Sequence, residues 1–170
     1  MKFIRLFEHD GSWLRFLRDW QNQCERLNDD FDLYQVSPIS VVEDLVRNEP
    51  RVDAGVFGLE DDEGFHAICQ VNCANLPGYS GRVLRVRMMY FAPSYDVGER
   101  NIEAYAEVLV RMFNEVLKLS DEDMRAPHIK FHLRSPADQR FFSELSAELD
   151  KLQAFASVEM LGSWLYITKK

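Results

Sequence analysis

The sequence is poor in cysteine, and this shortage argues against a disulfide-stabilised secreted protein. Its 170 residues include 3 cysteines, Cys24, Cys69 and Cys73, an odd and sparse set that favours reduced thiols. Cys69 and Cys73 fall in one predicted strand, where about 13 Å would separate them, too far for a disulfide. A metal site is not expected either, because no second Cys or His pair completes one.

Basic residues and long apolar runs are also scarce. The 20 Lys and Arg face 28 Asp and Glu, giving a net charge of −8. Binding to nucleic acid requires the opposite sign, so we expect no nucleic-acid partner. Apolar runs fall short of the ~20 residues that cross a bilayer, and the stretch 1–13 lacks the features of a signal peptide. We therefore expect a cytoplasmic protein with no membrane partner and a single domain over residues 1–170.

The short motifs of several enzyme classes are missing as well. The sequence contains no Gly-x-Ser-x-Gly, no P-loop and no His-Glu-x-x-His. Serine hydrolase, nucleotide triphosphatase and zinc protease chemistry are therefore unsupported.

The stretch Arg82–Leu117 reads as a strand, a loop and a long helix. Arg82–Ala92 is rich in Val, Leu, Met, Tyr and Phe, and Pro93–Arg100 holds residues typical of turns and helix starts. Asn101–Lys118 then repeats apolar residues at helical spacing. Because the first turn of a helix has free N–H groups and a partial positive charge, this stretch is suited to bind an anion.

The rest of the chain predicts a mixed sheet with helices around it. Besides the central stretch, the pattern predicts strands at Lys2–Phe7, Ala54–Glu60, Phe65–Leu76 and His128–Arg134, helices at Trp13–Leu27, Ile39–Arg47 and Pro136–Leu149, and a terminal hairpin at Gln153–Lys169. The order is β-α-α-β-β-β-α-β-α-β-β, which indicates an α/β (α+β) fold with a mixed, mostly antiparallel sheet flanked by helices.

This order is similar to the GNAT fold, that of the Gcn5-related N-acetyltransferase superfamily. In that family the fourth strand ends in a pattern like Val-x-Pro-x-Tyr, and an Arg/Gln-x-x-Gly-x-Gly/Ala loop follows. Here the segment 91–95, Phe-Ala-Pro-Ser-Tyr, resembles the strand end, and residues 96–101 occupy the loop. The loop departs from the family pattern, since Asp96 replaces the basic residue and Gly98 is its one glycine.

The resemblance implies an acyl-CoA-dependent N-acyltransferase that uses acetyl-CoA or another acyl-CoA. The loop would hold the pyrophosphate through its amides, with Arg100 supplying positive charge, and an amide near Tyr90 or Phe91 would polarise the thioester carbonyl. The cofactor-binding residues implied are Tyr90, Phe91, Ser94, Tyr95, Val97, Gly98, Glu99, Arg100 and Asn101. The expected acceptor is a small-molecule or protein amine, and a homodimer is a further expected partner.

A second departure concerns the proton donor. After the fifth strand the family has an Asn and, seven residues later, a Tyr that protonates the leaving thiolate. Ser135 and Phe142 occupy these positions here, and Phe142 has no proton to give. Tyr95 and Tyr105 are the substitutes that we consider.

Candidate catalytic side chains are few. They are Glu60, His66, Tyr95 and His132. A histidine in a strand is more often structural than catalytic, and no neighbouring carboxylate in the sequence would orient either one.

Strand alternation places polar side chains together on three strands. Arg85 and Arg87 share one face, Gln70 and Asn72 share another, and His128, Lys130, His132 and Arg134 share a third. If these faces coincide, a positively lined cleft could hold an acidic substrate or the phosphates of a cofactor. The alternative is a solvated face with cross-strand pairs to Asp and Glu.

Two other functions remain open from the sequence. The first is a catalytically inactive GNAT-fold protein that acts as a binding module, which Asp96, the missing glycines and Phe142 favour. The second is an acidic structural or inhibitory protein that engages a basic surface.

Overall fold

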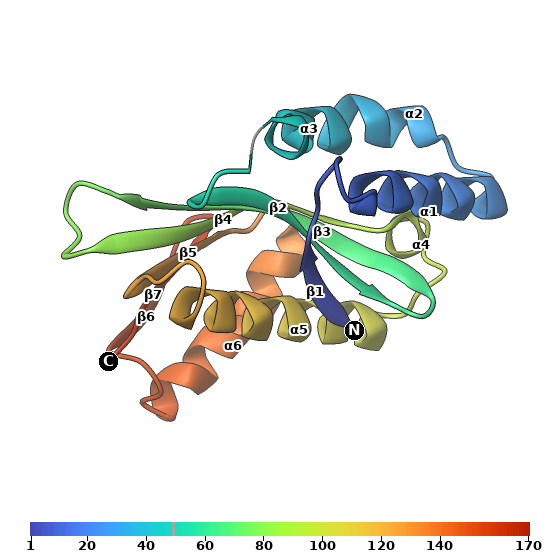
Figure 1. Cartoon of the computed structure of the whole chain (residues 1–170). Helices are drawn as coiled ribbons and strands as arrows, with labels where there is room; N and C mark the ends of the chain where they lie inside the picture. The colour runs from blue at the N-terminus through green and yellow to red at the C-terminus, as the bar shows by residue number, and fades with distance from the viewer. Residues whose placement is uncertain (49) are drawn as a thin grey trace.

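A seven-stranded sheet in the order β1-β2-β3-β4-β5-β7-β6 forms the centre of the computed structural model, which describes residues 1–48 and 50–170 (Figure 1). Its strands are β1 (Lys2–Arg5), β2 (Ala54–Asp61), β3 (Gly64–Asn75), β4 (Arg82–Phe91), β5 (His128–His132), β6 (Ser157–Leu161) and β7 (Trp164–Thr168). β4 and β5 pair in parallel, while the other neighbours pair antiparallel. The predicted mixed, mostly antiparallel sheet is confirmed.

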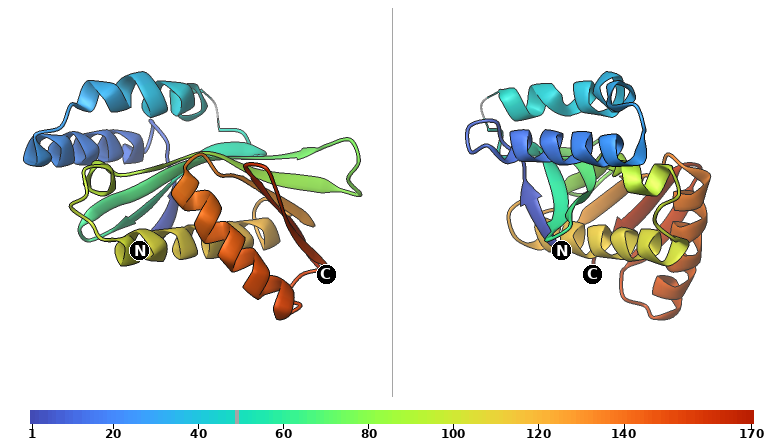
Figure 2. Two further views of the ribbon diagram at one scale, coloured as in Figure 1. Left: turned by 180° about the vertical axis from the view of Figure 1, so that it is seen from behind. Right: turned by 90° about the vertical axis from the view of Figure 1, so that its right-hand side faces the viewer.

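Helices cover the two faces of this sheet unequally. They are α1 (Ser12–Leu27), α2 (Phe31–Tyr34), α3 (Ser40–Arg47), α4 (Pro93–Asp96), α5 (Ile102–Asp121) and α6 (Pro136–Lys151). Helices α1 to α3 lie on one face, and α5 and α6 lie on the other (Figures 1 and 2). Among the described residues, no helix is both long and apolar enough to cross a membrane.

Each face has its own apolar core. Phe16 and Trp20 of α1 pack with Val42 of α3 against β2 and β3 on the first face. On the other face, α5 and α6 pack against the sheet through an aromatic group in which Phe131 stacks on Phe113 and Phe142. The described cysteines are all free and buried in these cores.

The observed elements differ from the predicted ones mainly at their edges. The short helix α2 is absent from the predicted elements. It begins at Phe31, where Asp30 caps the helix by accepting a hydrogen bond from the Asp32 amide. The predicted helix Ile39–Arg47 begins at Ser40, because Pro38 lies in an irregular segment, Gln35–Ile39, kinked at Ser37. Side-chain capping and a kink are local details that apolar periodicity does not detect.

Candidate functional site

Strands β4 and β5 part midway along the sheet. Their pairing runs from Val83 opposite His128 to Val86 opposite Phe131, and among the described residues no strand pairs with β4 on that side beyond this point. The register between β3 and β4 also shifts there. Met88 has φ 49°, a left-handed conformation that is rare outside glycine and marks a bulge. The result is an opening between two strands beside a strained backbone.

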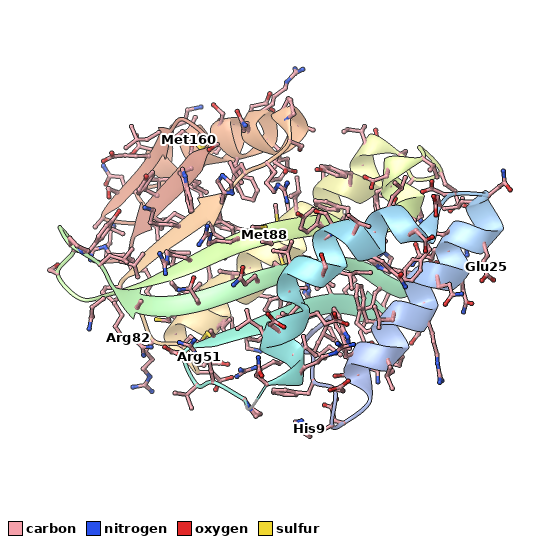
Figure 3. All side chains as sticks on the ribbon, turned by 90° about the horizontal axis from the view of Figure 1, so that it is seen from above. His9, Glu25, Arg51, Arg82, Met88 and Met160 are labelled. Carbon is pink, nitrogen blue, oxygen red and sulfur yellow. The ribbon has the colours of Figure 1, made fainter. Side chains whose placement is uncertain are left out.

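Arg134 reaches across this opening. It follows β5, and its guanidinium lies 4.7 Å from the centre of the Tyr90 ring on β4. Its Nη1 also lies 3.7 Å from Sδ of Met88. Figure 3 shows Met88 at the boundary between the half of the sheet beneath α1 to α3 and the half that no helix covers in that view. The side of the opening nearest α1 to α3 is therefore lined by a cation and an aromatic ring.

A groove of about 600 Å³ lies between α5 and α6. Most of the side chains that line it are apolar, and the full set is Ile102, Tyr105, Ala106, Pro136, Ala137, Arg140, Phe141 and Glu144. Tyr105 connects the groove to the sheet, because its ring stacks on that of Phe91 at 4.2 Å between centroids. The groove thus runs beside the ends of the parted strands.

The Tyr105 hydroxyl is held in place between the two helices. It donates a hydrogen bond to the carboxylate of Asp138, a residue that is 3% exposed. Burial, followed by this hydrogen bond, raises the pKa of Tyr105 above its ordinary value. The phenol therefore stays protonated at neutral pH, next to a groove.

The loop between α4 and α5 presents backbone amides. Gly98 has φ 76°, and Asn101 caps α5 by accepting a hydrogen bond from the Ala104 amide at 2.9 Å. The remaining amides of the first turn have no acceptor inside the helix. Such a helix start favours an anion.

Charged side chains of this loop are paired with other segments. Arg100 contacts Glu63 at 2.5 Å, and Glu99 contacts Arg26 of α1 at 3.2 Å. Arg100 is thus engaged by a carboxylate and is not free to contribute its full charge to the loop. The charge of Glu99 is offset in the same way.

Asp96 is directed away from the loop amides. Its carboxylate accepts a hydrogen bond of 3.0 Å from the Tyr34 hydroxyl of α2. Burial raises the pKa of Asp96, and the nearby Asp29 adds to this, although the Tyr34 hydrogen bond opposes it. The Asp96 carboxylate therefore forms its hydrogen bond with α2.

His66 and Tyr95 belong to a buried hydrogen-bonded chain. The two ring nitrogens of His66 lie 2.8 Å from the Tyr95 hydroxyl and 2.8 Å from the Asp61 carboxylate. The chain lies beside a polar cavity of about 200 Å³ formed by α1, the β2–β3 turn and the α4 segment. That cavity and the α5–α6 groove have different lining residues. The contact between His66 and Tyr95 therefore connects α4 to β3. Strand β3 pairs with the edge of β4 that faces away from the opening.

The remaining catalytic candidates lie apart. Glu60 forms an ion pair of 3.0 Å with Arg15 of α1, near the edge of the sheet. His132 is the last residue of β5, one position beyond the pairing with β4, and its ring lies 4.5 Å from that of Trp164. Of the predicted candidates, His132 is the one nearest the opening in the strand register.

Phe142 and Ser135, at the two positions compared with the proton-donor pattern, have structural roles in this chain. Phe142 is 0% exposed and lies within the aromatic core. Ser135 caps α6, where it accepts a hydrogen bond of 2.9 Å from the Asp138 amide. Both residues thus contribute to packing and helix capping.

Sequence reasoning missed the bulge at Met88 and the groove lining. A methionine in a strand carries no signal for positive φ, so nothing could have found the bulge. The groove had a weak signal, because Ile102 and Ala106 lie four positions apart on the exposed side of a helix start. Its other wall comes from α6, which only the tertiary structure brings near.

Comparison with solved structures finds similar chain arrangements in bacterial proteins. A possible acetyltransferase from Clostridium difficile 630 has 12% identity and a TM-score of 0.49, covering 94% of this chain and 93% of that one. A ribosomal-protein-alanine N-acetyltransferase from Brucella melitensis biovar Abortus 2308 has 13% identity and a TM-score of 0.48, covering 85% and 91%. A predicted acetyltransferase with acetyl-CoA from Clostridium acetobutylicum has 11% identity and a TM-score of 0.40, covering 85% and 87%.

Sequence comparison gives no corresponding result, since no protein-family model and no curated protein matches this chain. At 11–13% identity the likeness to solved structures concerns the fold alone. Apart from the short helices α2 and α4, the element order and the mixed, mostly antiparallel sheet are those that the sequence predicted.

Proposed function

We propose that the protein is an acyl-CoA-dependent N-acyltransferase. The observation that carries this proposal is the parting of β4 from β5 beyond Val86, with the Met88 bulge on one side and the α5–α6 groove along the strand ends. A strand that leaves its ladder has amides available for a ligand. An apolar groove beside such amides suits a long, partly apolar acyl carrier.

The groove and the neighbouring loop fit acyl-CoA. Tyr105, Ala106 and Phe141 would contact the apolar arm, and the amides at the start of α5 would bind the pyrophosphate. The pairing of Glu99 with Arg26 supports this role, because it limits the repulsion of a phosphate by Glu99. When bound, acyl-CoA supplies the thioester whose carbonyl carbon is attacked by an amine.

The side chains at the opening supply the proton transfers. His132 is the candidate base for the acceptor amine, since it lies where the strands part. Tyr105 is the candidate acid for the leaving thiolate, because its phenol lines the groove and carries a proton at neutral pH. An amide of β4 beyond Val86 would donate a hydrogen bond to the developing oxyanion.

A second candidate function is an inactive binding module with the same fold. The burial of Phe142, at 0% exposure, favours it, because the family's proton donor is replaced by a core residue. This alternative predicts ligand binding without turnover.

Thermal-shift titration with CoA and acetyl-CoA tests the proposal. At ~100 times its dissociation constant, a ligand that binds the folded state adds about 2.7 kcal/mol and should raise the Tm by several degrees. Ala106→Trp fills the groove and should abolish the shift. Val110→Trp, at a position of α5 that is 42% exposed and outside the groove lining, should retain it.

The same titration separates the two candidate functions. A saturable shift together with acyl transfer to an amine panel supports the transferase, and Tyr105→Phe should then lower kcat more than it changes KM for acyl-CoA. A shift without transfer to any amine favours the binding module. No shift at millimolar CoA, or an equal shift in the Ala106→Trp variant, would overturn the assignment of the groove.

A further inference from the structure

The polar strand faces predicted from alternation do meet, and they form one continuous surface. In the register Asn72 lies opposite Arg85, Arg85 opposite Lys130, and Lys130 opposite Tyr166. Gln70 lies opposite Arg87 in the neighbouring row. Because residues opposite each other share a face of the sheet, these rows run across β3, β4, β5 and β7.

Within residues 1–48 and 50–170, no helix covers this surface. The core beneath α1 to α3 includes Val56 of β2 and Ile68 of β3, and it reaches β4 only near its end. Figure 3 looks down on this face and shows β4, β5, β7 and β6 exposed beside the α1–α3 layer. The rows therefore form an open floor that leads to the parting of β4 and β5.

The floor is basic, although the protein as a whole carries a net charge of −8. Arg85, Arg87, Lys130 and Arg134 belong to it. Across the described chain, none of them forms an ion pair with a carboxylate, whereas arginines elsewhere do so. Arg85 directly faces Lys130, and like charges opposite each other are destabilising. An acidic residue is found at the rim, where exposed Glu159 lies opposite Tyr166.

Arg85 also has a buried donor without an acceptor. Its Nε is inaccessible to solvent and has no hydrogen-bond partner among the described residues. An unsatisfied buried donor is destabilising, and more so when it is charged. An anion bound on the floor would offset the repulsion between Arg85 and Lys130.

Aromatic rings hold the cations in position. The Lys130 ammonium lies 4.4 Å from the centre of the Tyr166 ring and 4.9 Å from that of Trp164. Arg134 lies over Tyr90 at the opening. Aromatic faces stabilise these charges without neutralising them, so the floor keeps its positive potential and gains flat apolar surfaces.

We propose that this floor binds the acceptor through an oxyanion group, a carboxylate or a phosphate, so that the acceptor is an acidic amine. The inference rests on the proposed function. Arg87 and Arg134 would bind the oxyanion, because a guanidinium matches the geometry of carboxylate and phosphate oxygens. The amine would then lie towards the opening and His132. Nucleic acid fits less well, since the acidic remainder of the molecule would repel a long polyanion.

Tryptophan fluorescence in the absence of acyl-CoA tests the floor directly. Trp164 lies on the floor, whereas Trp13 and Trp20 are 1% and 0% exposed, so a ligand there should change the emission of Trp164, and Trp164→Phe should remove the response. The probes are two matched pairs, phenylalanine with phenylalaninamide and O-phosphoethanolamine with ethanolamine. In one pair we expect the member that carries the oxyanion to bind at least tenfold tighter than its counterpart that lacks it, and the pair that responds identifies the oxyanion.

Arginine variants supply the matched controls. Arg87→Ala, at an exposed position, should weaken binding of the oxyanion-bearing probe at least tenfold. Arg87→Lys should restore part of the affinity. Arg18→Ala, at an exposed position of α1 remote from the floor, should have no effect. Both alanine variants should keep the wild-type Tm to within a few degrees, which separates loss of the site from loss of the fold.

The outcomes distinguish this inference from the proposed function. Arg87-dependent binding of an oxyanion-bearing probe supports the proposed anion site, even if CoA gives no thermal shift. A thermal shift with CoA, together with equal affinity for the probes with and without the oxyanion, overturns the proposed anion site and leaves the proposed transferase function intact. Binding confined to a single-stranded oligonucleotide, or unaffected by Arg87→Ala, also overturns the inference.

Discussion

At the residue scale, the behaviour of Asp96 depends on a partner that is distant in the sequence. Tyr34 donates a hydrogen bond to it from a helix 62 positions earlier in the chain. Burial of the carboxyl group raises its pKa. Asp96, which departs from the loop pattern of the GNAT family, therefore contributes to the contact between α2 and α4.

Asp96→Asn should stabilise the protein at neutral pH. The raised pKa means that the folded state binds a proton more tightly than the unfolded state, so stability falls as the pH rises through the folded value. Asparagine removes this penalty and still accepts the Tyr34 hydrogen bond. We expect a Tm gain of roughly 2 °C at pH 7.5 and a smaller one near pH 4, measured by calorimetry.

Asp62→Asn is the control for this change, because Asp62 is exposed in the β2–β3 turn. It should leave the Tm unchanged at both pH values. A loss of stability in Asp96→Asn at pH 7.5 would show that the carboxylate is favoured in the fold and that its pKa is not raised.

At the element scale, the start of α6 contributes both to the stability of the fold and to the shape of the groove. Ser135 and Asp138 form a reciprocal capping box, and Asp138 also accepts the Tyr105 hydrogen bond. The cap thus fixes the angle at which α6 leaves β5 and places one wall of the groove against α5. Ser135 and Asp138 thus position α6 as well as capping it.

Ser135→Ala should lower the free energy of unfolding by about 1 kcal/mol, within a range of about 0.5–2 kcal/mol, because the Asp138 amide loses its acceptor. Urea unfolding measures the loss, and hydrogen exchange at the Asp138 amide should speed up. Ser143→Ala, an exposed change in the middle of the same helix, should be neutral or slightly stabilising. Equal effects of the two changes would argue against the cap.

At the scale of the whole molecule, one sheet separates two apolar cores. Ile68 belongs to the core beneath α1 to α3, and its neighbour Cys69 belongs to the core beneath α5 and α6. Neither core can lose its sheet face without disturbing the other. The two layers are therefore expected to unfold together.

Ile68→Ala should lower the midpoint of a single unfolding transition that both layers share. Removing this fully buried side chain should cost about 2–5 kcal/mol. In a Trp164→Phe background, fluorescence of the buried Trp13 and Trp20 reports one layer, and far-UV circular dichroism reports all helices. We expect equal midpoints for both probes in the wild type and the variant. Separate midpoints, with only the fluorescence transition shifted, would show that the layers unfold independently.

The sequence by itself determined the element types, their order and the faces of the strands. Apolar periodicity reports burial along a single element, so the helix at 101–118 and the polar alternation of Arg85, Lys130 and His132 could be read locally. The tertiary structure alone decided that the polar faces meet, that β4 bulges at Met88 and that Asp96 turns away. These features depend on strand register and on contacts between distant segments, and local patterns carry no information about either.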